Sequence, residues 1–291
     1  MTAIRFHVWG CRGGRNTRGS RIGNSTSCYS LVTGEDLFVF DAGRGLVTAA
    51  EEVAPGGQLA DVKRVHVIIT HAHMDHWEGL KDAQWMWRRG NGVELTVFAP
   101  NEALTTIRAG HEPPAFVALD VLALGTLAKL SFVPTVAGTQ VALPGATLTT
   151  APLHHYSGIA PNRRFLETVG YRLAIDGGPA IAYLCDHEPT AATQPVEDAL
   201  LADSQLALVD ANYARIADHA FGHGSIEYAA QVARRHTNVH VLATHHGPML
   251  SDRDIDDAHR TFGKGCANLA VSTEHSEARW NPAARRFEPV P

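Results

Sequence analysis

The sequence THAHMDHWEG, residues 70–79, decides the fold expected of this chain, because it places three histidines and an aspartate directly after a buried strand. The preceding run Arg64–Ile69 is short and rich in β-branched residues, as in strands inside a sheet. In an extended loop His71 and His73 point to the same side, so both can reach one cation. Asp75 and His76 then emerge at the first turn of a helix and can reach a second cation nearby.

The alternative is that this loop is simply solvated. Four clustered metal-binding side chains behind a buried strand argue against it, because crowded imidazoles are costly without a cation. Imidazoles with one carboxylate suit zinc, and manganese, iron or cobalt are alternatives that sequence does not separate. The sequence therefore predicts two divalent metal ions, with zinc preferred.

Apolar runs between Gly- and Pro-rich turns indicate mixed β structure in the first half and alternating strands and helices at the end. We expect one domain over residues 1–291, in which two sheets carry helices on their outer faces. The expected strands are 4–9, 27–32, 37–40, 64–69, 93–99, 168–175, 180–184, 206–209, 239–243 and 267–271. The expected helices are 44–53, 101–109 with Asn101 as its cap, 193–201 and 225–236, with a capping box at Ser251 and Asp254.

The metal loop resembles the HxHxDH signature of the metallo-β-lactamase superfamily. Residues 24–28 (NSTSC) and 40–43 (FDAG) resemble the opening strands of that superfamily, and residues 184–186 (LCD) resemble the strand that supplies its bridging aspartate. The resemblance covers nearly the whole chain. It implies an αββα sandwich of two mixed β-sheets with helices on the outer faces, and a dinuclear hydrolytic site.

The same resemblance implies further ligands, each offered by a pair of neighbouring histidines. Residues 152–155 offer His154 or His155, and residues 244–247 offer His245 or His246. We favour His155 and His245, although a slip of one residue reverses the direction of a side chain. One metal then takes His71, His73 and His155, the other takes Asp75, His76 and His245, and Asp186 bridges them.

A hydroxide that bridges the two metals is the implied nucleophile. Asp75 would orient it or accept its proton, which makes Asp75 catalytic as well as a ligand. Asp41 would either support the ligand histidines from behind or simply form the turn before Gly43.

His223-Gly224-Ser225 resembles the His-x-Ser/Thr motif of the tRNase Z-like phosphodiesterases, in which the histidine contacts the phosphate and assists the leaving group. A helix that begins after Ser225 also offers an anion site. We therefore expect His223 to be catalytic and His223, Ser225 and Trp77 to bind substrate. Alternatively, Ser225 only caps the helix, His223 is an exposed loop residue, and Trp77 packs in the core with 85-WMW-87.

Composition narrows the substrate. The net charge is −5, and the one basic cluster, Arg12, Arg15, Arg18 and Arg21, either faces a phosphate or is solvated. With no basic tRNA-gripping insertion, a small-molecule or cyclic phosphodiester is favoured over long nucleic acid. Segment 111–143 is expected to set substrate choice. The alternatives are hydrolysis of an ester, lactone or amide, and a non-catalytic metal-binding or sensing protein.

Location and assembly are expected only in outline. No apolar run is long enough to span a bilayer, and the first residues carry no apolar signal segment, so we expect a cytoplasmic protein with no membrane partner. The four cysteines form no CxxC pair, which speaks against disulfides and a zinc knuckle. The resemblance makes a homodimer plausible.

Overall fold

Two large β-sheets form the body of the protein in the computed structural model, which describes residues 3–14, 19–83, 86, 93–116, 129–158 and 161–290. The first sheet has eight strands in the order β17-β16-β1-β2-β3-β4-β5-β6. Strands β3 to β6 run parallel, and the other neighbouring strands pair antiparallel. The bounds are β1 Ile4–Gly10, β2 Cys28–Thr33, β3 Asp36–Phe40, β4 Arg64–Ile68, β5 Glu94–Ala99, β6 Lys129–Pro134, β16 Glu277–Asn281 and β17 Arg286–Pro289.

The second sheet has seven strands in the order β15-β14-β13-β12-β11-β8-β7. Strands β12 to β15 run parallel, whereas β7, β8, β11 and β12 pair antiparallel. A separate two-stranded hairpin of β9 and β10 follows β8. The bounds are β7 Gln140–Leu143, β8 Ala146–Pro152, β9 Tyr156–Ser157, β10 Arg164–Phe165, β11 Val169–Ile175, β12 Ala180–Leu184, β13 Leu206–Asp210, β14 His240–Thr244 and β15 Leu269–Val271.

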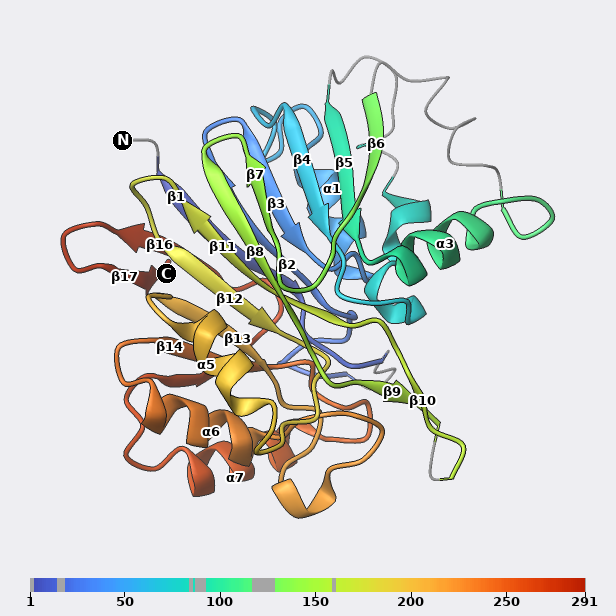
Figure 1. Ribbon diagram of the computed structural model, residues 1–291. Helices are drawn as coiled ribbons and strands as arrows, with labels where there is room; N and C mark the ends of the chain where they lie inside the picture. Colours follow the sequence, from blue (N-terminus) through green and yellow to red (C-terminus); the bar gives the residue numbers. More distant parts are fainter. Residues whose placement is uncertain are drawn as a thin grey trace.

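Helices cover the outer face of each sheet, so the expected αββα sandwich is confirmed (Figure 1). Helices α1 (Gly45–Glu52) and α3 (Asn101–Gly110) contact the first sheet, and α5 (Gln194–Leu201), α6 (Ile226–Arg235) and α7 (Asp252–Phe262) contact the second. Short 3₁₀ turns span Met74–His76, Glu78–Asp82 and Ile216–Asp218. Strand β3 shows why its last four residues are all apolar. Phe38 and Phe40 pack between the sheets, while Leu37 and Val39 pack in the core under α1 and α3.

Most expected elements occur within a residue or two of their predicted bounds, including the β11–β12 hairpin and the capping box at Ser251. Two expectations were incomplete or wrong. Asn101 is the first helical residue of α3 and makes no cap hydrogen bond, because Pro100 holds the cap position. No strand was predicted after residue 271. The structure has two more, β16 and β17, which join the first sheet, where β16 pairs with β1.

The arrangement of strands brings several strand ends to one edge of the sandwich. In the first sheet β3 and β4 run parallel. In the second sheet β8 runs in the same direction as β12, β13 and β14, because β11 is antiparallel to both β8 and β12. The loops that follow these strands carry the residues of the candidate site. No helix in the described part of the chain is both long and apolar enough to cross a membrane.

Candidate metal centre

The side chains assigned to the first metal come together although they derive from both sheets. His71 and His73 follow β4, and His155 follows β8. Ligand atoms of these three histidines and of Asp186 lie within 4.8 Å of one another. His73 Nδ1 is 3.0 Å from His155 Nε2, and Asp186 Oδ2 is 3.6 Å from Nε2 of both His71 and His155. The four donors therefore point at a common centre.

The side chains assigned to the second metal form an adjoining group. Ligand atoms of Asp75, His76 and His245 also lie within 4.8 Å of one another. Asp186 connects the two groups, since its carboxylate lies 3.3 Å from His76 Nε2 and 3.0 Å from His245 Nε2. Asp186 is 1% exposed, so its carboxylate is enclosed by the histidines of both groups.

The donor set fits a pair of cations better than it fits a hydrogen-bonded core. Nε2 of His71 and of His76 is buried, and neither atom has a hydrogen-bond partner within the described residues. A buried polar atom without a partner is costly. A bound cation would give the lone pair on each of these two nitrogen atoms a partner. Burial lowers the pKa of His71 well below its usual value and that of His155 to about 3, which leaves these two imidazoles neutral, as metals require. Burial also lowers the pKa of His76, but the carboxylates of Asp186, Asp41 and Asp75 outweigh it and raise that pKa well above its usual value.

Asp41 lies behind the second group and fixes one of its histidines. Its carboxylate accepts hydrogen bonds from His76 Nδ1 at 2.6 Å, from the Thr70 amide at 2.8 Å and from the Tyr183 hydroxyl at 2.6 Å. Asp41 also has a φ of 55°, so it forms the turn after β3. Both sequence interpretations of Asp41 are therefore correct, and the free Nε2 of His76 points into the cluster.

The two rings of each ambiguous histidine pair lie in different places. His154 packs against Phe165 and Tyr156, outside both groups, whereas His155 lies within the first. His246 is buried beside the carbonyl of Ala211, and His245 lies within the second group. The rings favoured from the sequence are thus the ones that meet Asp186.

His223 lies beside the two groups and is held by a carboxylate that sequence reasoning did not single out. Its Nδ1 is 2.9 Å from Asp210 Oδ2 and 3.8 Å from Asp186 Oδ2. Although burial lowers it, the carboxylates of Asp210 and Asp186 raise the pKa of His223 to about 9. Asp210 ends β13 next to β12 and β14, and this strand-end position was the available signal for it.

The other two predicted substrate contacts are occupied by the protein itself. The Ser225 hydroxyl is buried, accepts a hydrogen bond from the Tyr228 amide at the start of α6, and lies 2.8 Å from His219 Nε2. Trp77 is 6% exposed and donates its indole hydrogen to the Ala72 carbonyl. Its core interpretation therefore fits better than a stacking wall.

Other sequence expectations fall elsewhere. Arg12 neither faces a ligand nor lies in solvent, because its buried guanidinium donates to Ser20 Oγ at 2.8 Å and lies 3.3 Å from Asp252. Exposed Arg21 pairs with Asp256. Four further residues named from the sequence, and part of segment 111–143, lie outside the described residues, namely Arg15, Arg18, Trp85, Trp87 and 117–128.

Gly13, in the loop after β1, lies against the second group. A Cβ atom on Gly13 would lie 2.5 Å from His245 Nε2 and 2.4 Å from Asn212 Nδ2. Nothing lies within 4 Å of a Cβ on Gly19 in the same loop. The absence of a side chain at Gly13 therefore keeps the metal-facing nitrogen of His245 accessible.

We expect Gly13→Ala to displace the His245 ring and to weaken binding of one of the two metals by about ten- to a hundredfold, as loss of correct ligand orientation does elsewhere. Metal titration monitored by calorimetry measures this, and Gly19→Ala is the matched control, expected to bind like the wild type. Wild-type affinity for both metals in Gly13→Ala would show that the ring yields without consequence.

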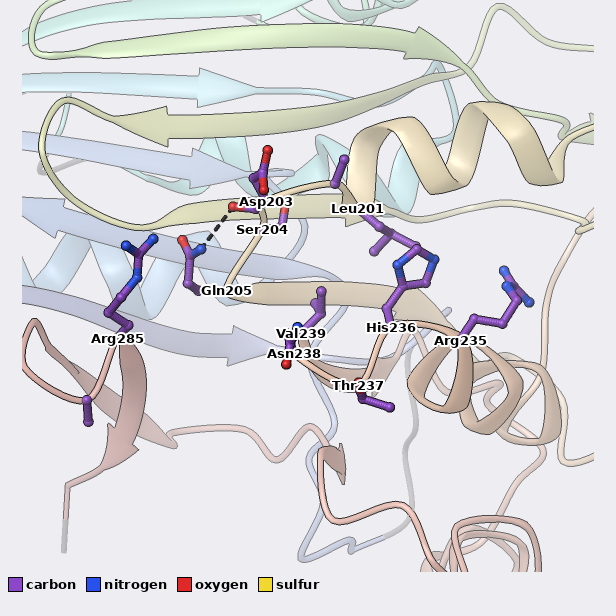
Figure 2. Close-up of a pocket in the computed structure, with 12 residues that line it drawn as sticks. Leu201, Asp203, Ser204, Gln205, Arg235, His236, Thr237, Asn238, Val239 and Arg285 are labelled. Atoms are coloured by element: carbon purple, nitrogen blue, oxygen red, sulfur yellow. Dashed lines mark hydrogen bonds between the residues drawn. The ribbon is translucent and has the colours of Figure 1, made fainter.

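A separate cavity of about 530 Å³ lies at the opposite end of the second sheet, before β13 and β14 (Figure 2). It is lined by Gln205, Asn238 and Arg285 among others, and it contains none of the metal-centre residues. His236 there is 2.7 Å from Asp198, and the Gln205 side chain accepts a hydrogen bond from the Ala180 amide and donates one to the Asp203 carbonyl. The cavity's polar groups are thus largely used by the fold.

Comparison with known proteins gives a consistent family. The sequence profile of the "Beta-lactamase superfamily domain" matches residues 37–246, a span that includes every residue of both groups. No curated protein matches the sequence.

Several solved structures resemble the whole chain at low sequence identity. The metallo-beta-lactamase fold protein YhfI from Bacillus subtilis aligns with a TM-score of 0.68 and 16% identity over 96% of this chain and 100% of its own. Yeast PDE1 aligns with a TM-score of 0.67 and 13% identity over 94% and 97%. A diphosphatase from the PhnP family aligns with a TM-score of 0.63 and 15% identity over 94% and 96%. At these identities the likeness establishes the fold alone.

Proposed function

Because this chain belongs to the metallo-β-lactamase superfamily of metal-dependent hydrolases, we propose that it hydrolyses a small or cyclic phosphodiester with two divalent metal ions, zinc in preference to manganese or iron. The observation that carries this proposal is the pair of adjoining donor groups that share Asp186. His71, His73 and His155 would hold one ion, Asp75, His76 and His245 the other, and Asp186 both. When bound, such ions supply a nucleophile from water at neutral pH and offset the charge that develops on phosphate oxygens.

The chain's own groups then direct the reaction. Of the two carboxylates in the centre, Asp75 is the more exposed, with a side chain 30% exposed against 2% for Asp186. It is therefore placed to accept a proton from attacking water as well as to bind metal. Asp41 and Ser27 orient His76 and His245 through the ring nitrogens that face away from the cluster.

His223 supports a phosphodiester in preference to other substrates. Its Nδ1 is engaged by Asp210, so its Nε2 is the nitrogen that can donate a hydrogen to a substrate. A donor held beside two cations suits a doubly esterified phosphate, whose departing oxygen needs a proton. Solved structures that share this fold include a diphosphatase and yeast PDE1, so the fold is compatible with phosphorus chemistry.

The partners follow from the same reasoning. The net charge of −5 disfavours long nucleic acid, which usually meets a basic surface. A small-molecule substrate therefore fits best. The cytoplasmic location and the homodimer stay predictions.

Metal analysis combined with a substrate panel tests the proposal. We expect close to two equivalents of metal after purification without chelator, and hydrolysis of bis(p-nitrophenyl) phosphate or a cyclic nucleotide that stops on metal removal and returns on adding zinc. If the protein hydrolyses esters, lactones or amides but no phosphodiester, the proposed phosphodiester substrate is wrong and one of those classes takes its place. Bound metal without turnover of either class would indicate a non-catalytic protein, and less than one equivalent would contradict the metal centre itself.

A further inference from the structure

Exposed apolar residues occur in the chain segments that border the metal centre. Six large hydrophobic residues are exposed among those described: Met74, Val136, Phe165, Ile216, Phe221 and Met249. Isolated residues of this kind are ordinary on a protein surface, whereas a group of them marks a binding site. Three of the six, Met74, Phe165 and Phe221, are each linked to the β9–β10 hairpin, and we refer to these three as the apolar rim.

Short contacts tie the segment that carries each rim residue to the hairpin or to the centre. Phe165 lies on β10, with its ring 5.0 Å from that of His154 and 5.6 Å from that of Tyr156. Met74 follows His73, whose Nε2 is 2.5 Å from Ser157 Oγ on β9. Phe221 precedes Gly222, whose carbonyl accepts a hydrogen bond from His155 Nδ1 at 2.8 Å. Leu166, which follows Phe165, donates its amide hydrogen to the His155 carbonyl at 3.1 Å, so the segments that carry the three rim residues border His73 and His155.

Phe221 is held in a conformation that a bulky residue rarely adopts. Its φ is 54°, in the left-handed region, and Gly222 after it has a φ of 77°. The side chain is nevertheless 47% exposed, so packing within the protein does not account for its presence. A strained residue with an exposed ring beside a reactive centre points to a role in binding.

A positive charge accompanies the rim. The Arg163 guanidinium lies over the Tyr156 ring, 4.5 Å from its centroid, on the same hairpin. Arg163 itself is exposed, so its charge is available to an anion near the rim. The surface beside the centre is thus suited to a molecule that is both anionic and apolar.

We propose that the apolar rim binds an alkyl or aryl group carried by the phosphate ester that the metal centre hydrolyses. This rests on the proposed function and specifies its substrate class as phosphate esters with a hydrophobic substituent. A substrate is favoured over a second copy of the chain because each rim residue lies in a segment that borders the centre, and a partner seated there would cover the site.

Calorimetric titration of the zinc-loaded protein with hexyl phosphate and methyl phosphate tests the proposal without relying on turnover. The two probes share one head group and differ by five methylenes, so partial burial of the chain is expected to make hexyl phosphate bind at least about tenfold more tightly. Phe165→Ser and Phe221→Gly should each reduce this ratio severalfold and leave methyl phosphate unchanged. Glycine tolerates the positive φ at residue 221, so that variant keeps the loop.

Val136→Ser is the matched control, since Val136 is 56% exposed, similar to Phe165 at 58%, but has no link to the rim. Equal affinity for both probes, absence of binding by either, or an unchanged ratio in both phenylalanine variants would overturn the proposal. So would a change in oligomeric state in these variants with the ratio kept, because the rim would then be an interface between copies. A retained hexyl preference without phosphodiester turnover would support the rim and reject the phosphodiesterase instead.

Discussion

Asp186→Asn is expected to lower kcat/KM by at least about a thousandfold and to reduce bound metal from two equivalents to one or fewer. Among the described residues, Asp186 alone has a carboxylate that approaches His71, His76, His155 and His245, at distances between 3.0 and 3.6 Å. An amide offers one neutral oxygen in its place, so it can neither join two cations nor balance their charge. Elemental analysis and steady-state kinetics on bis(p-nitrophenyl) phosphate measure the two effects.

Asp176→Asn provides the control for this prediction. Asp176 lies in the exposed turn between β11 and β12. Asp186 follows the opposite end of β12, so this turn is remote from the centre. It should retain wild-type metal content and activity. Two equivalents of metal and activity within tenfold of wild type in Asp186→Asn would show that Asp186 does not connect the two groups.

His223→Ala is expected to retain both metals and, on alkyl phosphodiesters, to lose about a hundred- to ten-thousandfold in kcat, the range for a positioned acid or base. His223 lies outside the two donor groups and its Nδ1 bonds Asp210, so its removal leaves the seven proposed ligands in place. If it protonates the departing oxygen, the loss should be largest for alkyl esters and small for p-nitrophenyl esters, whose leaving group needs no proton. Kinetics on such a pair, with metal content measured in parallel, test this.

His219→Ala is the matched control for His223→Ala, because His219 is a neighbouring histidine that contacts Ser225 and belongs to neither donor group. It should keep nearly full activity. Equal losses on alkyl and nitrophenyl esters would assign His223 to phosphate binding alone, and loss of metal would make it a ligand.

Sequence reasoning reached the metal loop because its signal is local. Three histidines and an aspartate within six residues follow a strand whose end the apolar pattern marks. Choosing within the His154-His155 and His245-His246 pairs was harder, since neither pair lies in a strand, where alternation would fix direction. His245 also has a φ of 56°, a backbone conformation that is uncommon for histidine and that the sequence does not predict. The choices therefore rested on resemblance.

Other features depend on contacts distant in sequence. Asp210 reads as an ordinary strand end until β13 brings it to His223. The polarity of Arg12 suggested solvent, yet a partner at Asp252, 240 residues away, allows it to be buried. Trp77 and Ser225 lie beside functional residues in sequence, but their atoms are used by the core and by a helix cap. Proximity in the chain did not predict orientation in space.

Both donor groups are assembled from the two halves of the chain. His71, His73, Asp75 and His76 precede the loop between β6 and β7, and His155, Asp186 and His245 follow it. Exposed Val136 and Gly138, with its positive φ, place that loop at the surface, where a cut is best tolerated, although Thr150 bonds the Val136 carbonyl and the Gly138 amide. Divided there, neither fragment would own a complete set of ligands. Fused to two interacting proteins, the fragments would form a complementation reporter. Hydrolysis would be detected only when the two proteins bind each other and bring the fragments together.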